Sequence, residues 1–506
     1  MSDYRANVES WVNQQDWCRI GCTIVVGWLP DAIPMIQSAS PIVDIIVFDP
    51  DGSAEKGDGY HVVDHLEDLK LAVQGRRWTQ LRINIICPPE YNQWAQSVGG
   101  AAEEGRHIGE VYHFTNSTHS RRWTDHGLDL LPRLAGLSPL VSLEGAAEGC
   151  IGVVVGSGPS LNDALPMLVE HRENLVIVAC DTAAPVLDAA GIIPDIVCAV
   201  EADPNSYKQS AGLSLWSKTI VAPGIHTHPD VWELPAGAIM PVVQPVGGFG
   251  RWFSRHSKIR GIVSGGSVGT LCYEVLCMLG CSTVVAVGMD CGYGKPGEVR
   301  EYADGIDIRE RDLTNKALGV QEVPGWGGEN VMSHPLMMMY RDWLSDRPRQ
   351  HPDVEHINCS VGGARLDGWT EVNPGPIAVE DAKPRPDLLT ISKATAPIDM
   401  DWVIPELERQ LEGSRRAESV AYAMLETQAA ALECVPDLIA LGGHAESELS
   451  RGRGVVPLNE WAWLPTPTHI RSAVSNTDRI VRNAREIRPL IERCIASLRG
   501  NNVRAA

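Results

Sequence analysis

Short apolar runs alternate with segments of helical spacing along the first part of the chain. Residues 23–26, 45–48 and 83–86 are β-rich, and residues 32–37 and 65–74 between them have helical spacing. This alternation predicts a Rossmann-like βαβ domain over residues 1–130. The turn at residues 27–30 reads Gly-Trp-Leu-Pro and lacks the glycine fingerprint, so no dinucleotide site is predicted there. Asp49, after the second strand, is expected to be a solvated strand-end carboxylate.

The same alternation continues with more glycine at the strand ends. Six further strands are predicted, at residues 152–155, 175–179, 196–200, 219–221, 262–263 and 283–287. They predict a central doubly wound, glycosyltransferase-like α/β domain over residues 131–380. Ligands of such sheets bind at the carboxyl ends of the strands, so this domain is expected to hold the active site.

A proline-rich stretch at residues 370–399 ends this pattern and indicates an extended linker. Beyond it, residues 402–413, 417–441 and 469–498 have helical spacing without strand signals. We therefore expect a linker and a helical C-terminal domain over residues 381–506. The arginines of the last helix are interpreted as a solvated face.

Composition limits the classes of partner that the protein is expected to bind. The 506 residues include 43 Lys and Arg against 64 Asp and Glu, a net charge of −21, which disfavours nucleic acid and anionic membranes as partners. The N-terminus lacks a basic and apolar export signal, and the apolar stretch 262–289 is interrupted by Glu274, so no membrane span is expected. The thirteen cysteines contain no C-x-x-C pair, which favours a reducing, cytoplasmic location; Cys272, Cys277, Cys281 and Cys291 are interpreted mainly as core residues.

The strongest chemical signal is the turn at residues 153–161, Val-Val-Val-Gly-Ser-Gly-Pro-Ser-Leu. Gly156 and Gly158 allow a ligand to approach the backbone closely. Ser160 and the amides at the start of the next helix are suited to hold a phosphate. Taken alone, such a turn is also compatible with a tight connection that binds nothing.

Two further strand ends strengthen the interpretation. Residues 264–270 form a second small-residue turn before a helix, and Gly288-Met289-Asp290 follows a third strand. Together with the carboxylates of Glu201, Asp203 and Asp290, these turns suit the phosphates and ribose hydroxyls of a nucleotide.

With these turns the sequence resembles the MptE-like domain family. This family joins archaeal 6-hydroxymethylpterin diphosphokinase to the motility-associated factor (Maf) flagellin glycosyltransferases. The flanking Rossmann-like and helical regions are also similar to the Maf arrangement. The blocks that carry the resemblance are residues 156–161, 191–195, 201–203, 266–268, 280–281 and 288–290, then Asn358, Gly362-Gly363-Ala364 and Gly368.

These blocks are also similar to those of bacterial sialyltransferases that use CMP-sialic acid. The resemblance implies a nucleotide site, two tyrosines on the leaving phosphate and a histidine base that deprotonates the acceptor. In this sequence the implied nucleotide-binding residues are Gly156, Ser157, Gly158, Ser160 and Ser267, the tyrosines are Tyr293 and Tyr302, and the base is His334.

Two other histidines, His226 and His228, follow a predicted strand and are alternative candidates for the base. They lack a third ligand at characteristic spacing, so no metal site is predicted from them. His334 follows a glycine loop at residues 325–328 that is suited to close over a site. The simpler interpretation of the same segment is a helix start with Ser333 as N-cap.

The expectation is therefore a Maf-like glycosyltransferase. It would transfer a sugar, such as a nonulosonic acid, from a CMP-linked nucleotide-sugar donor to a hydroxyl of a protein or glycan acceptor, with no cofactor required. The first alternative is a diphosphokinase that transfers pyrophosphate from ATP with Mg²⁺ held by Asp203 or Asp290. The second is a non-catalytic nucleotide-binding module.

Overall fold

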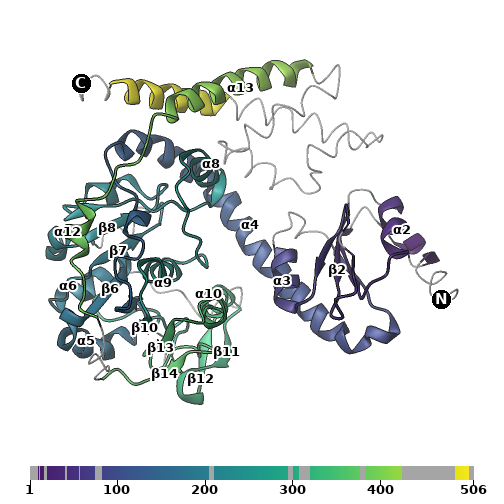
Figure 1. Cartoon of the computed structure of the whole chain (residues 1–506), viewed down its shortest axis with the longest axis horizontal. Helices are drawn as coiled ribbons and strands as arrows, with labels where there is room; N and C mark the ends of the chain where they lie inside the picture. The colour runs from purple at the N-terminus through teal and green to yellow at the C-terminus, as the bar shows by residue number, and fades with distance from the viewer. Residues whose placement is uncertain are drawn as a thin grey trace. The chain divides into compact units, whose positions relative to one another are not determined.

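The computed structural model divides the chain into two compact units, one ending at Thr118 and the other beginning at His119 (Figure 1). It describes residues 9–10, 12–15, 20–39, 43–55, 57–74, 82–203, 210–294, 300–306, 319–375, 383–423 and 485–500. Most of the predicted helices at 417–441 and 469–498 lies outside these residues.

The first unit contains a four-stranded parallel sheet of order β3-β2-β1-β4. The predicted βαβ alternation is confirmed, and β3 is an additional strand. The elements are β1 (Ile20–Val26), α2 (Ala32–Ala39), β2 (Asp44–Phe48), β3 (His61–Val63), α3 (Leu66–Gln74) and β4 (Arg82–Ile86).

Side chains of this unit itself occupy the strand ends where a dinucleotide would bind. Gly27 has a φ of +81°, and a side chain at this position would overlap the ring of Tyr91. Asp49 is 1% exposed, so the expectation of a solvated carboxylate is wrong. Its carboxylate accepts hydrogen bonds from the Ala54 amide and the Ser53 hydroxyl, which makes it the cap of a tight turn.

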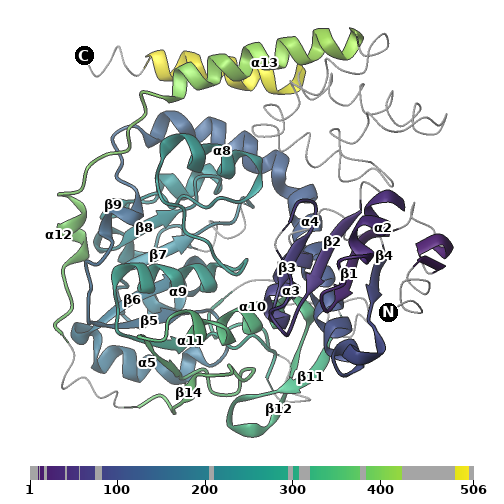
Figure 2. The same cartoon turned by 45° about the vertical axis from the view of Figure 1, so that its right-hand side comes forward.

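The second unit contains an eight-stranded sheet in which all neighbouring strands are parallel (Figure 2). In spatial order the strands are β14 (Thr370–Glu371), β13 (Glu355–Asn358), β10 (Thr283–Val287), β5 (Ile151–Val155), β6 (Leu175–Cys180), β7 (Ile196–Ala199), β8 (Ile220–Pro223) and β9 (Ala238–Ile239). Because the chain builds outward from β5 through β9 and then returns to β10 on the other side, the direction of winding reverses between β5 and β10.

One predicted strand is wrong. Residues 262–263 do not join a ladder. The Ile262 amide donates one hydrogen bond to the Val243 carbonyl at 2.9 Å, and the chain then turns into α9 (Val268–Leu279).

Helices cover both faces of the sheet. Buried residues of α5 (Leu161–Glu170), α6 (Ala184–Ala189) and α8 (Gly247–Ser257) form one core cluster with the strands. Helix α9 lies on the opposite face, where Cys272 and Cys281 pack among aliphatic side chains as predicted. The apolar runs of the strands are buried on both faces, as expected for a parallel sheet.

The 43-residue helix α4 (Asn92–Leu134) was not predicted, and residue 130 lies within it. Its last turns place Leu128, Leu131 and Leu134 in the core of the second unit. The same turns carry His119, Trp123 and His126.

The described C-terminal part is helical, as predicted. Helix α13 (Val403–Ala423) and a helix at residues 485–500 contribute Val403, Leu407, Ile487 and Ile491 to the core cluster of the second unit. The Arg488 Nε donates to the Ser414 hydroxyl at 3.1 Å, so this arginine joins the two helices instead of lying on a solvated face. No helix of the described part is long and apolar enough to cross a membrane.

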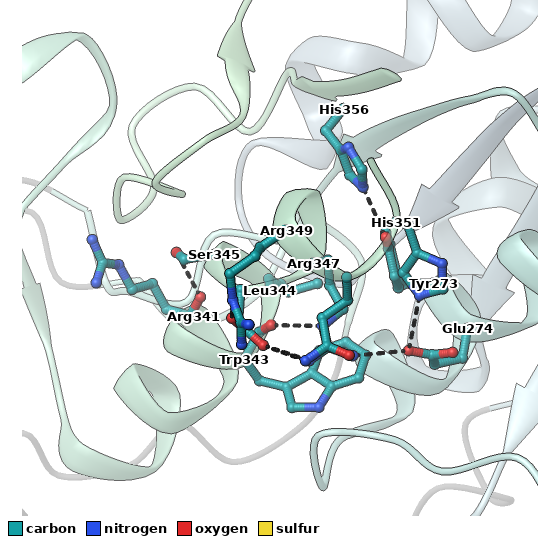
Figure 3. Close-up of polar contacts among 12 residues, drawn as sticks. Tyr273, Glu274, Arg341, Trp343, Leu344, Ser345, Arg347, Arg349, His351 and His356 are labelled. Carbon is teal, nitrogen blue, oxygen red and sulfur yellow. Dashed lines mark hydrogen bonds and ion pairs between the residues drawn. The ribbon is translucent and has the colours of Figure 1, made fainter. Parts of the chain in front are cut away.

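Helix α10 (Pro335–Ser345) follows the antiparallel hairpin of β11 (Gln321–Pro324) and β12 (Asn330–Ser333). The Arg347 guanidinium, just after α10, lies 4.0 Å from the centroid of the Trp343 ring, and its Nη1 pairs with Glu274 on α9 at 3.3 Å (Figure 3). These contacts fix the carboxyl end of α10 on α9.

Candidate functional site

The glycine turn after β5 lies against the end of β10. The Gly156 amide donates to the Val287 carbonyl and the Gly158 amide to the Gly288 carbonyl, each at 2.9 Å. A Cβ at Gly156 would overlap the Gly288 carbonyl, and one at Gly158 would overlap the Asp290 carboxylate. The two strand ends therefore meet backbone to backbone at the point where the winding reverses, which only glycine permits.

Asp290 closes this junction. It is 5% exposed; its Oδ2 accepts the Ser160 amide hydrogen at 2.9 Å and its Oδ1 accepts the Ser160 hydroxyl. Burial raises the pKa of Asp290 to about 6, although its hydrogen bonds with Ser160 oppose this shift. Two of the donors predicted to hold a phosphate are thus bonded to Asp290 here, and a ligand phosphate at Ser160 would have to replace that carboxylate.

A third segment packs on the same residue. The Ala364 amide donates to the Asp290 carbonyl at 2.7 Å, and a Cβ at Gly363 would lie 2.6 Å from the Asp290 Cα. Cys291, the next residue, has a φ of +46°, which is uncommon outside glycine. Close backbone contact therefore explains Gly363, whereas Gly362 has a φ of +84°, which favours glycine.

The second small-residue turn also reaches this junction. Ser267 is the N-cap of α9 in a capping box with Thr270, whose amide donates to the Ser267 hydroxyl at 3.2 Å. A Cβ at Gly269 would lie 2.6 Å from the Met289 Cε, so the start of α9 lies on the end of β10. The predicted role of Ser267 in nucleotide binding stays a prediction.

The predicted tyrosines occupy different surroundings. Tyr293 is fully buried, and its ring lies edge-on to His334 at 5.6 Å between centroids. The Tyr302 hydroxyl donates to Glu301 at 3.1 Å. Its neighbour Ala303 donates from its amide to the Ser157 carbonyl at 2.9 Å, which places this segment beside the glycine turn.

The predicted base, His334, is the N-cap of α10, in place of the Ser333 cap considered from the sequence. Its Nδ1 accepts the Met337 amide hydrogen at 3.1 Å, and the side chain is 3% exposed. A neutral imidazole carries hydrogen on one nitrogen only, so this bond places the hydrogen on Nε2. In this state Nε2 is a donor, and only Nδ1, once released from the cap, can accept a proton.

The carboxylates that follow β7 lie two strands from the glycine turn, in the direction of β9. Asp203 pairs with Arg122 of α4 at 3.5 Å. Desolvation raises the pKa of Glu201, and Asp203 adds to this shift while His119 opposes it. Asp181, directly after β6, was not identified from the sequence; burial and the charge of Glu201 raise its pKa to about 7. Its position directly after a predicted strand is the sequence signal that could have identified Asp181.

The alternative histidines are fixed in a loop after β8. His226 is 3% exposed, and the His228 Nδ1 accepts the Asp230 amide hydrogen at 3.3 Å. Among the described residues, no group of three His, Cys, Asp or Glu side chains has the arrangement of a metal site. The rings of Trp123 and His126 on α4 contact these histidines, a neighbourhood that the sequence analysis missed.

Comparison with known proteins shows what this region is similar to. Residues 127–296 match the family model described as 6-hydroxymethylpterin diphosphokinase MptE-like. Residues 127–296 are therefore similar to an MptE-like domain. An uncharacterized protein of Treponema pallidum (strain Nichols) is 36% identical over 55 residues, which are 11% of this chain and 26% of that protein. The chain therefore spans only about a quarter of that relative's length.

The fold has a solved counterpart. The structure of a Maf glycosyltransferase from Magnetospirillum magneticum AMB-1 is similar, with a TM-score of 0.58 and 15% sequence identity, over 96% of this chain and 82% of that chain. The likeness therefore extends well beyond the MptE-like domain to the regions on either side. That domain contains the glycine turn and Asp290, whereas Tyr302, His334 and Gly363 follow it.

We predict that Gly158→Ala destabilises the second unit by about 1–3 kcal/mol, because the added methyl overlaps the Asp290 carboxylate. Chemical denaturation followed by circular dichroism measures this. Gly413→Ala, in α13 with no atom near its Cβ, is the matched control and should be neutral or stabilising. Equal stability of Gly158→Ala and the wild type would contradict the tight junction.

Asp290→Asn should change how stability depends on pH. A buried carboxyl whose pKa is about 6, against an ordinary 3.8, binds a proton more strongly in the folded state. Wild-type stability should therefore fall, relative to Asp290→Asn, by about 3 kcal/mol as the pH rises from about 4 to about 6, and then level off. Denaturant midpoints of both proteins, measured across this pH range, test the prediction. If stability depends on pH in the same way in both proteins, the raised pKa of Asp290 is excluded.

Proposed function

We propose that the protein is a glycosyltransferase that transfers a sugar from a CMP-linked donor to a hydroxyl of a protein or glycan. The observation that carries this proposal is the junction of two small-residue strand ends, Gly156–Ser160 and Gly288–Asp290, where the winding of an MptE-like domain reverses. Ligands of open α/β sheets bind at such points. The fold shared with a Maf glycosyltransferase supports the same chemistry.

In this proposal the nucleotide lies at the glycine turn and the start of α9, held by Gly156, Ser157, Gly158, Ser160 and Ser267. Asp290 is proposed to contact its hydroxyls. Glu201 and Asp203, which the sequence analysis also assigned to the nucleotide, follow β7, two strands from the glycine turn. Tyr293 and Tyr302 stabilise the departing phosphate; preorganised donors of this kind lower the barrier where charge develops. For Ser160 to reach a phosphate, Asp290 must first give up its hydrogen bonds to that serine.

His334 is proposed as the base that takes the proton of the acceptor hydroxyl. The bond to the Met337 amide restricts how it does so: Nδ1 must leave the helix cap, because Nε2 already carries the hydrogen. Proton transfer from the acceptor hydroxyl would therefore be coupled to release of the first turn of α10.

The diphosphokinase is the second candidate, favoured by the description of the matching family. It requires Mg²⁺, which binds carboxylate oxygens in near-octahedral geometry. Asp203 pairs with Arg122 and Asp290 with Ser160, so the residues predicted to hold the ion do not fit it as they are placed.

The first test is ligand preference. We expect CMP to raise the melting temperature of the full chain more than UDP, GDP or ATP, because a ligand that binds the native state stabilises it. CMP release from CMP-N-acetylneuraminic acid should persist in EDTA. A preference for ATP together with activity that requires Mg²⁺ would instead establish the diphosphokinase.

The second test separates the two roles of His334. Asparagine is a good N-cap and carries no imidazole, so His334→Asn should keep the melting temperature, whereas His334→Ala should lose about 1 kcal/mol of stability. Both variants should lower kcat for CMP release about 10²–10⁴-fold, with CMP affinity unchanged. Full turnover by His334→Asn would show that His334 acts as a helix cap and not as the base.

A further inference from the structure

A second cluster of side chains lies two and three strands away from the glycine turn, at the carboxyl ends of β7 and β8. Helix α4 supplies His119, Trp123 and His126, and the loop after β8 supplies His226 and His228. The Trp123 ring lies 5.2 Å from that of His226 and 5.8 Å from that of His119 between centroids, and His126 lies 5.5 Å from His228.

The loop that carries these histidines is held rigidly. The Gly224 amide and the Thr227 hydroxyl both donate to the Ala199 carbonyl, at 2.8 and 2.9 Å. The His228 amide donates to the Glu201 carbonyl at 3.0 Å. The loop after β8 is thus fixed to the end of β7, and the cluster is formed before any ligand arrives.

Two imidazole nitrogens of the cluster are left unused. The Nδ1 atoms of His126 and His226 are buried without a hydrogen-bond partner among the described residues. Leaving a buried polar atom unsatisfied costs about 1–3 kcal/mol, so such atoms call for a partner. Burial lowers the pKa of His226 to about 4, and the nearby His126 contributes, so this ring is neutral at pH 7 and offers one donor and one acceptor.

The charges around these histidines indicate the chemical class of ligand that could bond to them. Glu201 and Asp203 follow β7, and Arg122, a cation beside them among the described residues, pairs with Asp203. Asp181, at the end of β6, adds a third carboxyl, which a pKa of about 7 leaves about half ionised at pH 7. A phosphate or carboxylate would be repelled here, whereas hydroxyl groups bind both to carboxylates and to neutral imidazoles.

We propose that this cluster, His226 and Glu201 with the surrounding α4 side chains, is a subsite for an uncharged sugar ring, as an acceptor glycan presents. The proposal rests on the proposed function for its place in the reaction, but its contacts are independent of the nucleotide site. The anionic ring of a nonulosonic acid would lie elsewhere, next to the phosphate-binding turn.

The test uses the full chain with three probes: methyl β-D-glucopyranoside, the methyl glycoside of N-acetylneuraminic acid, and CMP. Saturation-transfer NMR and calorimetry should show the neutral glycoside binding at least ten-fold more tightly than the acidic one. His226→Phe keeps a ring beside Trp123 without its nitrogens and should weaken the neutral glycoside at least ten-fold, with CMP affinity unchanged. The control is His256→Phe, in α8 against Trp402, which should change neither affinity.

Glu201→Gln provides a second variant if His226→Phe does not fold. Removing the carboxylate charge should raise the affinity for the acidic glycoside and so narrow the difference between the two sugars. If wild-type protein does not bind the neutral glycoside, or if His226→Phe binds it as well as wild type, the subsite is excluded. Neutral-sugar binding without CMP binding would uphold the subsite and reject the proposed nucleotide chemistry.

Discussion

One buried carboxylate holds together the part of the sheet on which the site depends. The side chain of Asp290 binds the amide and hydroxyl of Ser160, and its main chain accepts the Ala364 amide. Three segments far apart in sequence thus meet on one residue where the winding of the sheet reverses. The close approach requires glycine at 156, 158 and 363, since a Cβ at any of them would overlap its neighbours. Keeping the carboxyl buried is unfavourable to its charged form, which is why its pKa rises to about 6.

This junction divides the carboxyl edge of the sheet into two regions of different chemistry. Around β5 and β10 the backbone dominates: glycines, helix starts and a serine provide N–H and O–H donors suited to phosphate. Around β7 and β8 the side chains of Glu201, Asp203 and the buried His226 dominate, and they suit uncharged hydroxyls. A transferase has to hold an anionic leaving group and a neutral nucleophile at the same time. The two regions provide such a division on neighbouring strand ends of one sheet.

The features that could be predicted are those encoded locally. The runs that form β5, β6, β7 and β10 are short and predominantly apolar, and glycine follows β5 and β10, so the parallel sheet could be recognised from the sequence. The bond between Ser160 and Asp290 spans 130 positions and has no local signature. Helix α4 was missed because its sequence includes the pair Gly99-Gly100, which weakens the helical pattern. Because α4 was not predicted, the Trp123 ring could not be placed beside His226, although His226 and Glu201 themselves were identified from the sequence.

The position of His334 links the chemistry of the site to the stability of one helix. The carboxyl end of α10 is fixed on α9 by Arg347, which contacts both Trp343 and Glu274. Its amino end depends on the His334 side chain, which accepts the Met337 amide hydrogen. A helix held at its carboxyl end and capped by an imidazole at its amino end can open its first turn while the carboxyl end stays on α9. The same imidazole cannot cap the helix and take a proton at Nδ1, so the two states of this turn exclude each other. Any role of His334 as a base therefore carries a conformational step with it.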